Sequence, residues 1–124
     1  MIVAIVLDPA SAGLELLAER MPVWAVDAPH NRSVAEKMWH SRGAADAFQG
    51  ITVFQPQHGT NAEANCLEIL DQVDLHHGVH SSGQQIQSLH VVGALPSESL
   101  RSELSSLGLS KIEATQDGFT ASVA

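Results

Sequence analysis

Apolar residues along this chain occur either as short continuous runs or as longer stretches in which they recur every three or four positions. The run at residues 2–7 is continuous and rich in Ile and Val, which is typical of a strand covered on both faces, as in a parallel sheet. Shorter apolar runs at residues 23–26 and 51–54 predict two more strands. Residues 88–93, in which His90 alternates with Leu89 and Val91, predict a fourth.

The stretches between the runs show the helical spacing i, i+3, i+4, i+7. We expect the first helix to start at Asp8, because Asp is a favoured N-cap and Pro9 fits the first helical position, and to end before Pro22. The second helix is predicted to start at the capping-box sequence of residues 33–36, with Asn31 as an alternative cap, and to end near residues 42–43.

The third and fourth predicted helices follow the same rules. A capping box at residues 60–63 opens the third, whose apolar positions include Cys66, Ile69 and Val73. Residues 96–97 open the fourth, which ends at Gly108.

The last fourteen residues before the C-terminal alanine predict a hairpin. Residues 110–115 and 119–123 flank an Asp117-Gly118 pair, a common hairpin turn. Three β-α units, a fourth β-α unit and this antiparallel hairpin predict a layered αβα domain with a mainly parallel sheet. The length of 124 residues fits a single domain over residues 1–124.

The charge of the chain argues against two classes of binding partner. The net charge is -8, and residues 43–100 contain no Lys or Arg. Nucleic-acid and anionic-membrane binding both draw on clustered Lys and Arg, so neither is expected. The apolar start lacks the basic segment of a signal peptide, and cytoplasmic residence is the default expectation.

Two acids end predicted strands. Asp8 follows the first strand and Asp27 the second. Ligands of open α/β sheets bind outside the carboxyl ends of the strands, and two carboxylates there would suit Mg²⁺. The alternatives are a helix cap for Asp8 and an Asx-turn for Asp27.

His58 follows the third strand and should lie at the same end of the sheet as these acids. A histidine at that place is a candidate for general acid–base catalysis, or else a solvated loop residue. His90, inside the fourth strand, is expected to be structural, and Cys66 to be a buried thiol.

The densest group of candidate ligands comes at the end of the third helix. Asp74, His76, His77 and His80 offer one carboxylate and three imidazoles within seven residues. Zinc takes three or four such ligands, so this group is a candidate metal site, with His76 and His77 also candidate catalytic residues. The alternative is an exposed polar loop.

Whether this histidine group can join Asp8, Asp27 and His58 in one site depends on where the third helix ends. If the third helix runs to Val73, the histidines lie at the amino end of the sheet, far from Asp8, Asp27 and His58. If residues 73–77 are instead a short strand, as their Val-x-Leu-x-His alternation allows, His76 and His77 move to the carboxyl end.

Two functions remain. The first is a small acidic binding or inhibitor-like protein that engages a basic protein partner through Glu63, Glu68, Asp71 and Asp74. The second is a metal-dependent hydrolase or lyase acting on a small substrate, with Zn or Mg held by the histidine group or by Asp8 and Asp27. The weakness of every motif favours the first.

Overall fold

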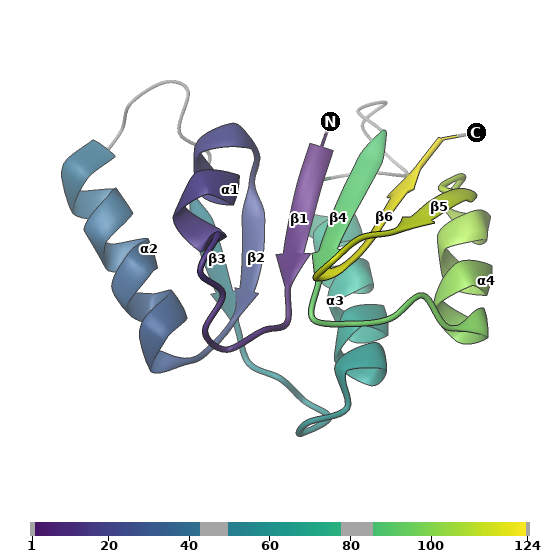
Figure 1. Ribbon diagram of the computed structural model, residues 1–124, viewed down its shortest axis with the longest axis horizontal. Helices are drawn as coiled ribbons and strands as arrows, with labels where there is room; N and C mark the ends of the chain where they lie inside the picture. The colour runs from purple at the N-terminus through teal and green to yellow at the C-terminus, as the bar shows by residue number, and fades with distance from the viewer. Residues whose placement is uncertain (1, 43–49, 78–85, 124) are drawn as a thin grey trace.

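The computed structural model describes residues 2–42, 50–77 and 86–123, and within these ranges six strands form one sheet with four helices packed on it (Figure 1). The strands are β1 (Ile2–Val6), β2 (Val23–Val26), β3 (Ile51–Phe54), β4 (Ser88–Val92), β5 (Lys111–Ala114) and β6 (Gly118–Ser122). The helices are α1 (Leu14–Arg20), α2 (Pro29–Arg42), α3 (Ala62–His77) and α4 (Glu98–Ser106). The predicted layered α/β fold is confirmed.

The strand order is β3-β2-β1-β4-β6-β5. Pairing is parallel from β3 through β4 and antiparallel between β4, β6 and β5. The predicted hairpin is therefore present, with β6 rather than β5 next to the parallel strands. The sheet has a parallel half, β1 to β3, and an antiparallel half, β4 to β6.

In the parallel half, β1 and β2 are covered on both faces, whereas the edge strand β3 is only partly buried. Ala4 and Val6 of β1 pack with Leu14, Ala18 and Met38 beneath α1 and α2. The alternate residues of β1 belong to a larger core under α3 and α4, together with Ile69, Leu70, Leu100, Leu104 and Phe119. Burial on both faces explains why β1 and β2 are continuous apolar runs.

In the antiparallel half, the described helices cover one face of the sheet. Leu89 and Val91 of β4 are buried under α3 and α4, whereas Ser88, His90 and Val92 are only partly buried. In β6 the same alternation buries Phe119 and Ala121. Figure 1 shows why: α1 and α2 lie over β1 to β3, and no described helix lies over the same face of β4, β6 and β5.

The two halves meet at β1 and β4, where the direction of chain progression reverses. Gly93, directly after β4, has a φ of +95°, and a Cβ on it would lie 2.9 Å from the backbone nitrogen of Asp8. Only glycine permits this close approach of the loops after β1 and β4. Reversal points of this kind are where open α/β sheets bind ligands.

Three predicted helix starts are wrong. α1 begins at Leu14 rather than at Asp8-Pro9, because the Asp8 carboxylate accepts the Ala10 backbone N–H at 2.9 Å and closes an Asx-turn. α2 begins at Pro29, which leaves the predicted box at residues 33–36 and the alternative cap Asn31 inside the helix. In α3 it is Asn61, not Thr60, that accepts the Ala64 N–H.

The structure also distinguishes the two alternatives for residues 73–77, a helix or a short strand. α3 is helical through His77, so the extended alternative for these residues is wrong. At 1.5 Å per residue, its sixteen residues span about 24 Å. The helix starts near the carboxyl ends of the strands and ends near their amino ends.

No helix in the described part of the chain is both long and apolar enough to cross a membrane.

Candidate functional site

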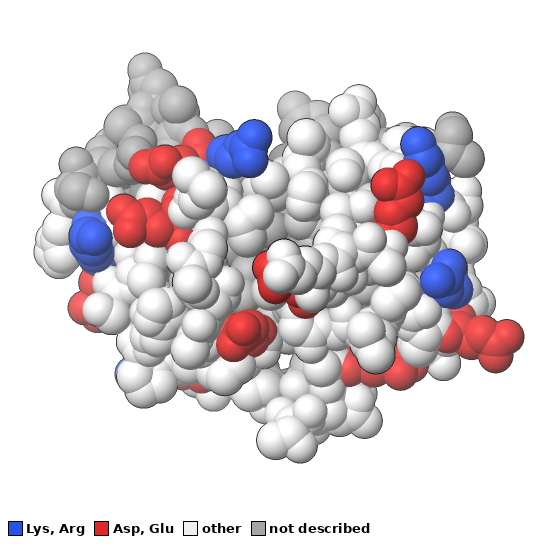
Figure 2. Space-filling view, viewed as in Figure 1, with Lys and Arg blue, Asp and Glu red and all other residues white. Residues whose placement is uncertain are grey.

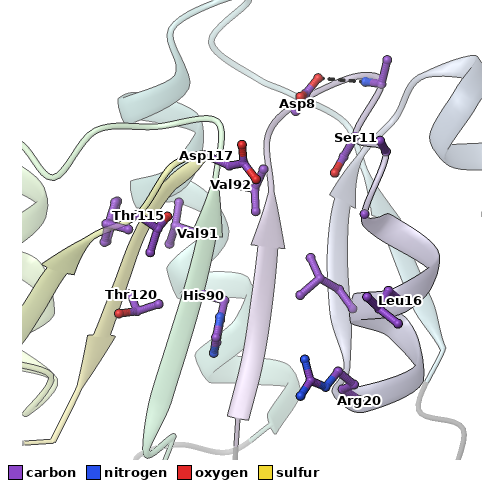
Figure 3. A pocket seen from close by; sticks show the side chains of 15 residues that line it. Asp8, Ser11, Leu16, Arg20, His90, Val91, Val92, Thr115, Asp117 and Thr120 are labelled. Carbon is purple, nitrogen blue, oxygen red and sulfur yellow. Dashed lines mark hydrogen bonds between the residues drawn. The ribbon is translucent and has the colours of Figure 1, made fainter.

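The uncovered face of β4 and β6 borders α1, and the two form a groove with a volume of about 540 Å³. We call it the α1–β4 groove. Its polar side chains come from α1, β4, β6 and two loops at the carboxyl end of the sheet (Figure 3). They include Asp8, Ser11, Arg20, His90, Asp117 and Thr120.

Strand alternation makes the floor of the groove polar. His90 of β4 lies opposite Thr120 of β6 and opposite Ala4 of β1 in the sheet register. These positions point away from the core under α3 and α4, because their neighbours Leu89 and Phe119 point into it. The floor thus carries an imidazole and a hydroxyl side by side, at the border of the helix-covered half.

Helix α1 supplies the wall. Leu16 and Leu17 line the groove, and 62% of the Leu16 side chain is exposed. Figure 2 shows the same face of the molecule in space-filling form: acidic side chains lie near its middle among uncharged surface, and side chains of both signs lie toward its edges. The groove therefore combines an apolar wall with a polar floor, the usual lining of a small-molecule site.

Opposite charges stand at the two ends of the groove. Asp8 and Asp117 lie at the carboxyl end of the sheet, whereas Arg20 lies at the last turn of α1, toward the amino end (Figure 3). Neither carboxylate nor the guanidinium forms an ion pair with another described residue. All three charged groups are exposed or half-buried, so they are available to a ligand.

The loop that carries Asp8 and Ser11 is held from α2. Asn31, buried at the start of α2, donates one amide hydrogen to the Asp8 carbonyl at 3.1 Å and the other to the Val26 carbonyl at 2.9 Å. His30 Nε2 donates to the Ser11 carbonyl at 2.9 Å. These bonds tie the ends of β1 and β2 together and fix one end of the groove.

Asp27, the second carboxylate of the predicted magnesium pair, does not line the groove. Arg32 Nε forms an ion pair with its Oδ1 at 2.7 Å, and Gln55 donates to its Oδ2. Asp8 and Asp27 thus share an end of the sheet but face different partners. Among the described residues, no three His, Cys, Asp or Glu side chains are arranged to hold a metal ion.

His58 also lies outside the groove. Its Nε2 is 3.0 Å from the Glu68 carboxylate of α3, and its backbone N–H donates to Asn65 Oδ1 at 2.9 Å. The structure therefore joins two residues that were predicted to have separate roles, His58 in catalysis and Glu68 in partner binding. Both side chains are partly exposed, His58 by 49% and Glu68 by 37%.

The histidine group cannot complete this site. Because α3 is helical to His77, the backbone at residues 74–77 lies at the opposite end of the sheet from Asp8, Asp27 and His58. The side chains of Asp74, His76 and His77, and the whole of His80, are outside the described part of the structure. A metal or catalytic role for them stays a prediction.

The predicted partner-binding acids fall on α3, and α4 extends them. Leu67 of α3 and Glu98, Ser99, Ser102 and Glu103 of α4 line a second groove of about 530 Å³. We call the exposed side of these two helices, with Glu63 and Asp71, the α3–α4 surface; Glu68 lies in a different groove, with Thr52 of β3 and Gln55. Arg101 is the one described cation of the α3–α4 surface, and its Nε donates to the Pro96 carbonyl at 3.0 Å.

Sequence reasoning missed four residues of the α1–β4 groove: Arg20, His90, Asp117 and Thr120. His90 was expected to be structural, although the alternation of polar and apolar residues in β4 and β6 signals one solvated face. No sequence signal marks Arg20, because its place in the groove depends on where α1 packs.

Comparison of the chain with protein-family models, with curated proteins and with solved structures found no match. The groove at the reversal point of the sheet is therefore the feature on which a functional proposal rests.

Proposed function

We propose that this protein binds a small polar ligand in the α1–β4 groove. The observation that carries the proposal is a cavity of about 540 Å³ with charges of opposite sign at its two ends, none of which forms an ion pair with another described residue. Small-molecule sites typically measure about 300–1,000 Å³, combine apolar walls with a few polar groups, and favour the reversal points of α/β sheets.

A fragment screen by ¹H–¹⁵N NMR tests the proposal. We expect binders whose shift changes concentrate at His90, Thr120 and the amides of residues 8–13. A Thr120→Trp variant should abolish these changes, because an indole on the uncovered face fills the groove without entering the core. Ser102→Trp, in the groove between α3 and α4, is the matched control.

Two outcomes of the fragment screen would contradict the proposal. Fragments that bind Thr120→Trp as well as they bind the unmodified protein occupy some other place. A screen without any hit at the groove residues would also remove the proposal.

A second candidate function is the binding of a basic protein partner on the α3–α4 surface. The observation that favours it is the position of Glu98 and Glu103, which add α4 carboxylates to the acids of α3. Electrostatic complementarity of this kind mainly speeds association and makes it salt-dependent.

Matched charge reversals test this candidate with a decalysine peptide as the probe. Reversal of Glu63, Glu68, Asp71 and Asp74 to Lys should weaken binding more than the same change of net charge elsewhere. The control set is Glu15, Glu19, Glu36 and Glu113, from α1, α2 and β5. Equal losses of decalysine affinity in both sets would mean that only net charge matters, and would contradict a specific binding surface on α3 and α4.

A further inference from the structure

We infer that the ligand of the α1–β4 groove is a short peptide with both termini free, its amino end at Asp8 and Asp117 and its carboxylate at Arg20. This inference rests on the proposed function and adds the class of ligand and its direction. Its basis is the arrangement of charge and hydrogen-bonding groups along the groove.

The charges give the ligand its two ends. Asp8 uses one carboxylate oxygen to accept the Ala10 N–H at 2.9 Å. Asp117 uses its backbone carbonyl, not its side chain, to accept the Gly93 N–H at 2.9 Å, and this bond joins its turn to the loop after β4. Both acids therefore keep carboxylate oxygens for a cation. Arg20 has a planar guanidinium suited to a carboxylate.

Two structural restraints keep the acidic end in place. The loop of Asp8 is held by Asn31, and the turn of Asp117 is closed by the Gly118 N–H, which donates to Thr115 Oγ1 at 3.1 Å. An amino group arriving there meets two negative charges that need no large rearrangement. Preorganisation of this kind raises affinity because less order must be created on binding.

The length of α1 sets the separation of the ligand's charges. Its seven residues span about 10 Å, and the two charged ends of the groove flank that span. An extended peptide covers about 3.3 Å per residue, so a tripeptide matches the distance. A single amino acid would satisfy only one end at a time.

The floor and wall suit the middle of a peptide. His90, Thr120 and the Thr115 hydroxyl offer hydrogen bonds to peptide amides, and Leu16 and Leu17 offer contact for apolar side chains. A purely aliphatic zwitterion of the same length would leave the polar floor groups without partners.

Calorimetry with trialanine tests the assignment. We expect a dissociation constant on the order of 0.1–1 mM, since the ligand is small and the groove open. Acetylation of the amino terminus and amidation of the carboxyl terminus should each weaken binding about fivefold, as expected for loss of one partly exposed charge pair.

Variants identify which end meets which residue. In Asp8→Asn/Asp117→Asn the acetylation penalty should disappear while the amidation penalty remains. In Arg20→Gln the reverse should hold. Asp27→Asn, a carboxylate at the same end of the sheet but outside the groove, should leave both penalties unchanged.

Three outcomes would overturn the inference, and they separate it from the proposed function. Penalties that persist in the variants would show that the termini bind elsewhere. Equal affinity for 8-aminooctanoate, which has similar charge separation and no amides, would overturn the peptide class. Failure of trialanine while neutral fragments still bind at His90 would overturn the inference and leave the proposed function standing.

Discussion

The two halves of the sheet differ in how many faces helices cover, and this difference creates the candidate site. In the parallel half, α1 and α2 cover one face and α3 the other, so β1 and β2 are apolar throughout. In the antiparallel half the described helices cover only one face, and β4 and β6 alternate between buried and partly buried residues. The α1–β4 groove lies at the border, where a helix wall meets a bare sheet face.

Val6 and Val92 give the sharpest test of this comparison, because they lie opposite each other in the register and on the same face. Val6 is fully buried, and Val92 is partly buried. Val6→Asn should lower the free energy of unfolding by about 3 kcal/mol or more, because it buries an amide without partners. Val92→Asn should cost about 1 kcal/mol. Urea denaturation measures both, and equal losses would mean that the two halves do not differ in coverage.

The seam between the halves can be tested at Gly93. Gly93→Ala combines an unfavourable positive φ with a Cβ 2.9 Å from the Asp8 nitrogen, and should cost about 2–3 kcal/mol. Gly108 has a comparable φ of +84° but nothing within 4 Å of the added Cβ. Gly108→Ala should therefore cost only about 1 kcal/mol in the same denaturation experiment. Similar costs would contradict a tight contact between the loops after β1 and β4.

Asn31 links the covered half to the groove. Asn31→Ala removes two hydrogen bonds to the Asp8 and Val26 carbonyls and should cost about 2 kcal/mol. It should also speed amide hydrogen exchange at Ala10, whose N–H bonds to the Asp8 side chain. Asn61→Ala, which removes the cap of α3, should cost about 1 kcal/mol and leave exchange at Ala10 unchanged. Unchanged exchange at Ala10 in the Asn31 variant would show that the loop is held by other contacts.

The smallest effect concerns the core that both halves share under α3 and α4. Burial raises the pKa of the Cys66 thiol from 9.0 to about 12, and the nearby Glu63 carboxylate adds to the rise. Between these values the unfolded chain loses the thiol proton while the folded protein keeps it, so stability falls as the pH rises above 9. The loss at pH 10 should be about 1 kcal/mol. Denaturation at pH 8 and pH 10 measures this loss, which should be absent in Cys66→Ala. If the free energy of unfolding fell equally between the two pH values in both proteins, the thiol would be open to water.

The sequence predicted the elements well where the signal was local. The four segments predicted as strands before the hairpin are strands, the four helical patterns are helices, and Asp117-Gly118 lies at the turn of the hairpin. It failed at helix starts, where more than one polar residue competes for the same role. Asp8 makes an Asx-turn instead of a cap, and Asn31 joins two strands instead of starting α2.

The candidate site was predicted only in part. Asp8 was expected at the carboxyl end of the sheet and lies there, whereas Asp27 and His58 at the same end have their own partners, Arg32 and Glu68. The histidine group was a candidate metal site because its residues are close in sequence. The groove residues Arg20, His90 and Asp117 are up to 97 positions apart, from 20 to 117, and only packing brings them together.

The sequence by itself determined which segments are strands and helices, since periodicity and turn residues act over a few positions. It also determined which face of β4 and β6 is polar. Only the tertiary structure decided that this face stays uncovered in the described part of the chain, because coverage depends on where α1 and α2 pack relative to distant strands. The groove is a consequence of that packing, so its charged ends could be recognised only after the strands and helices were assembled.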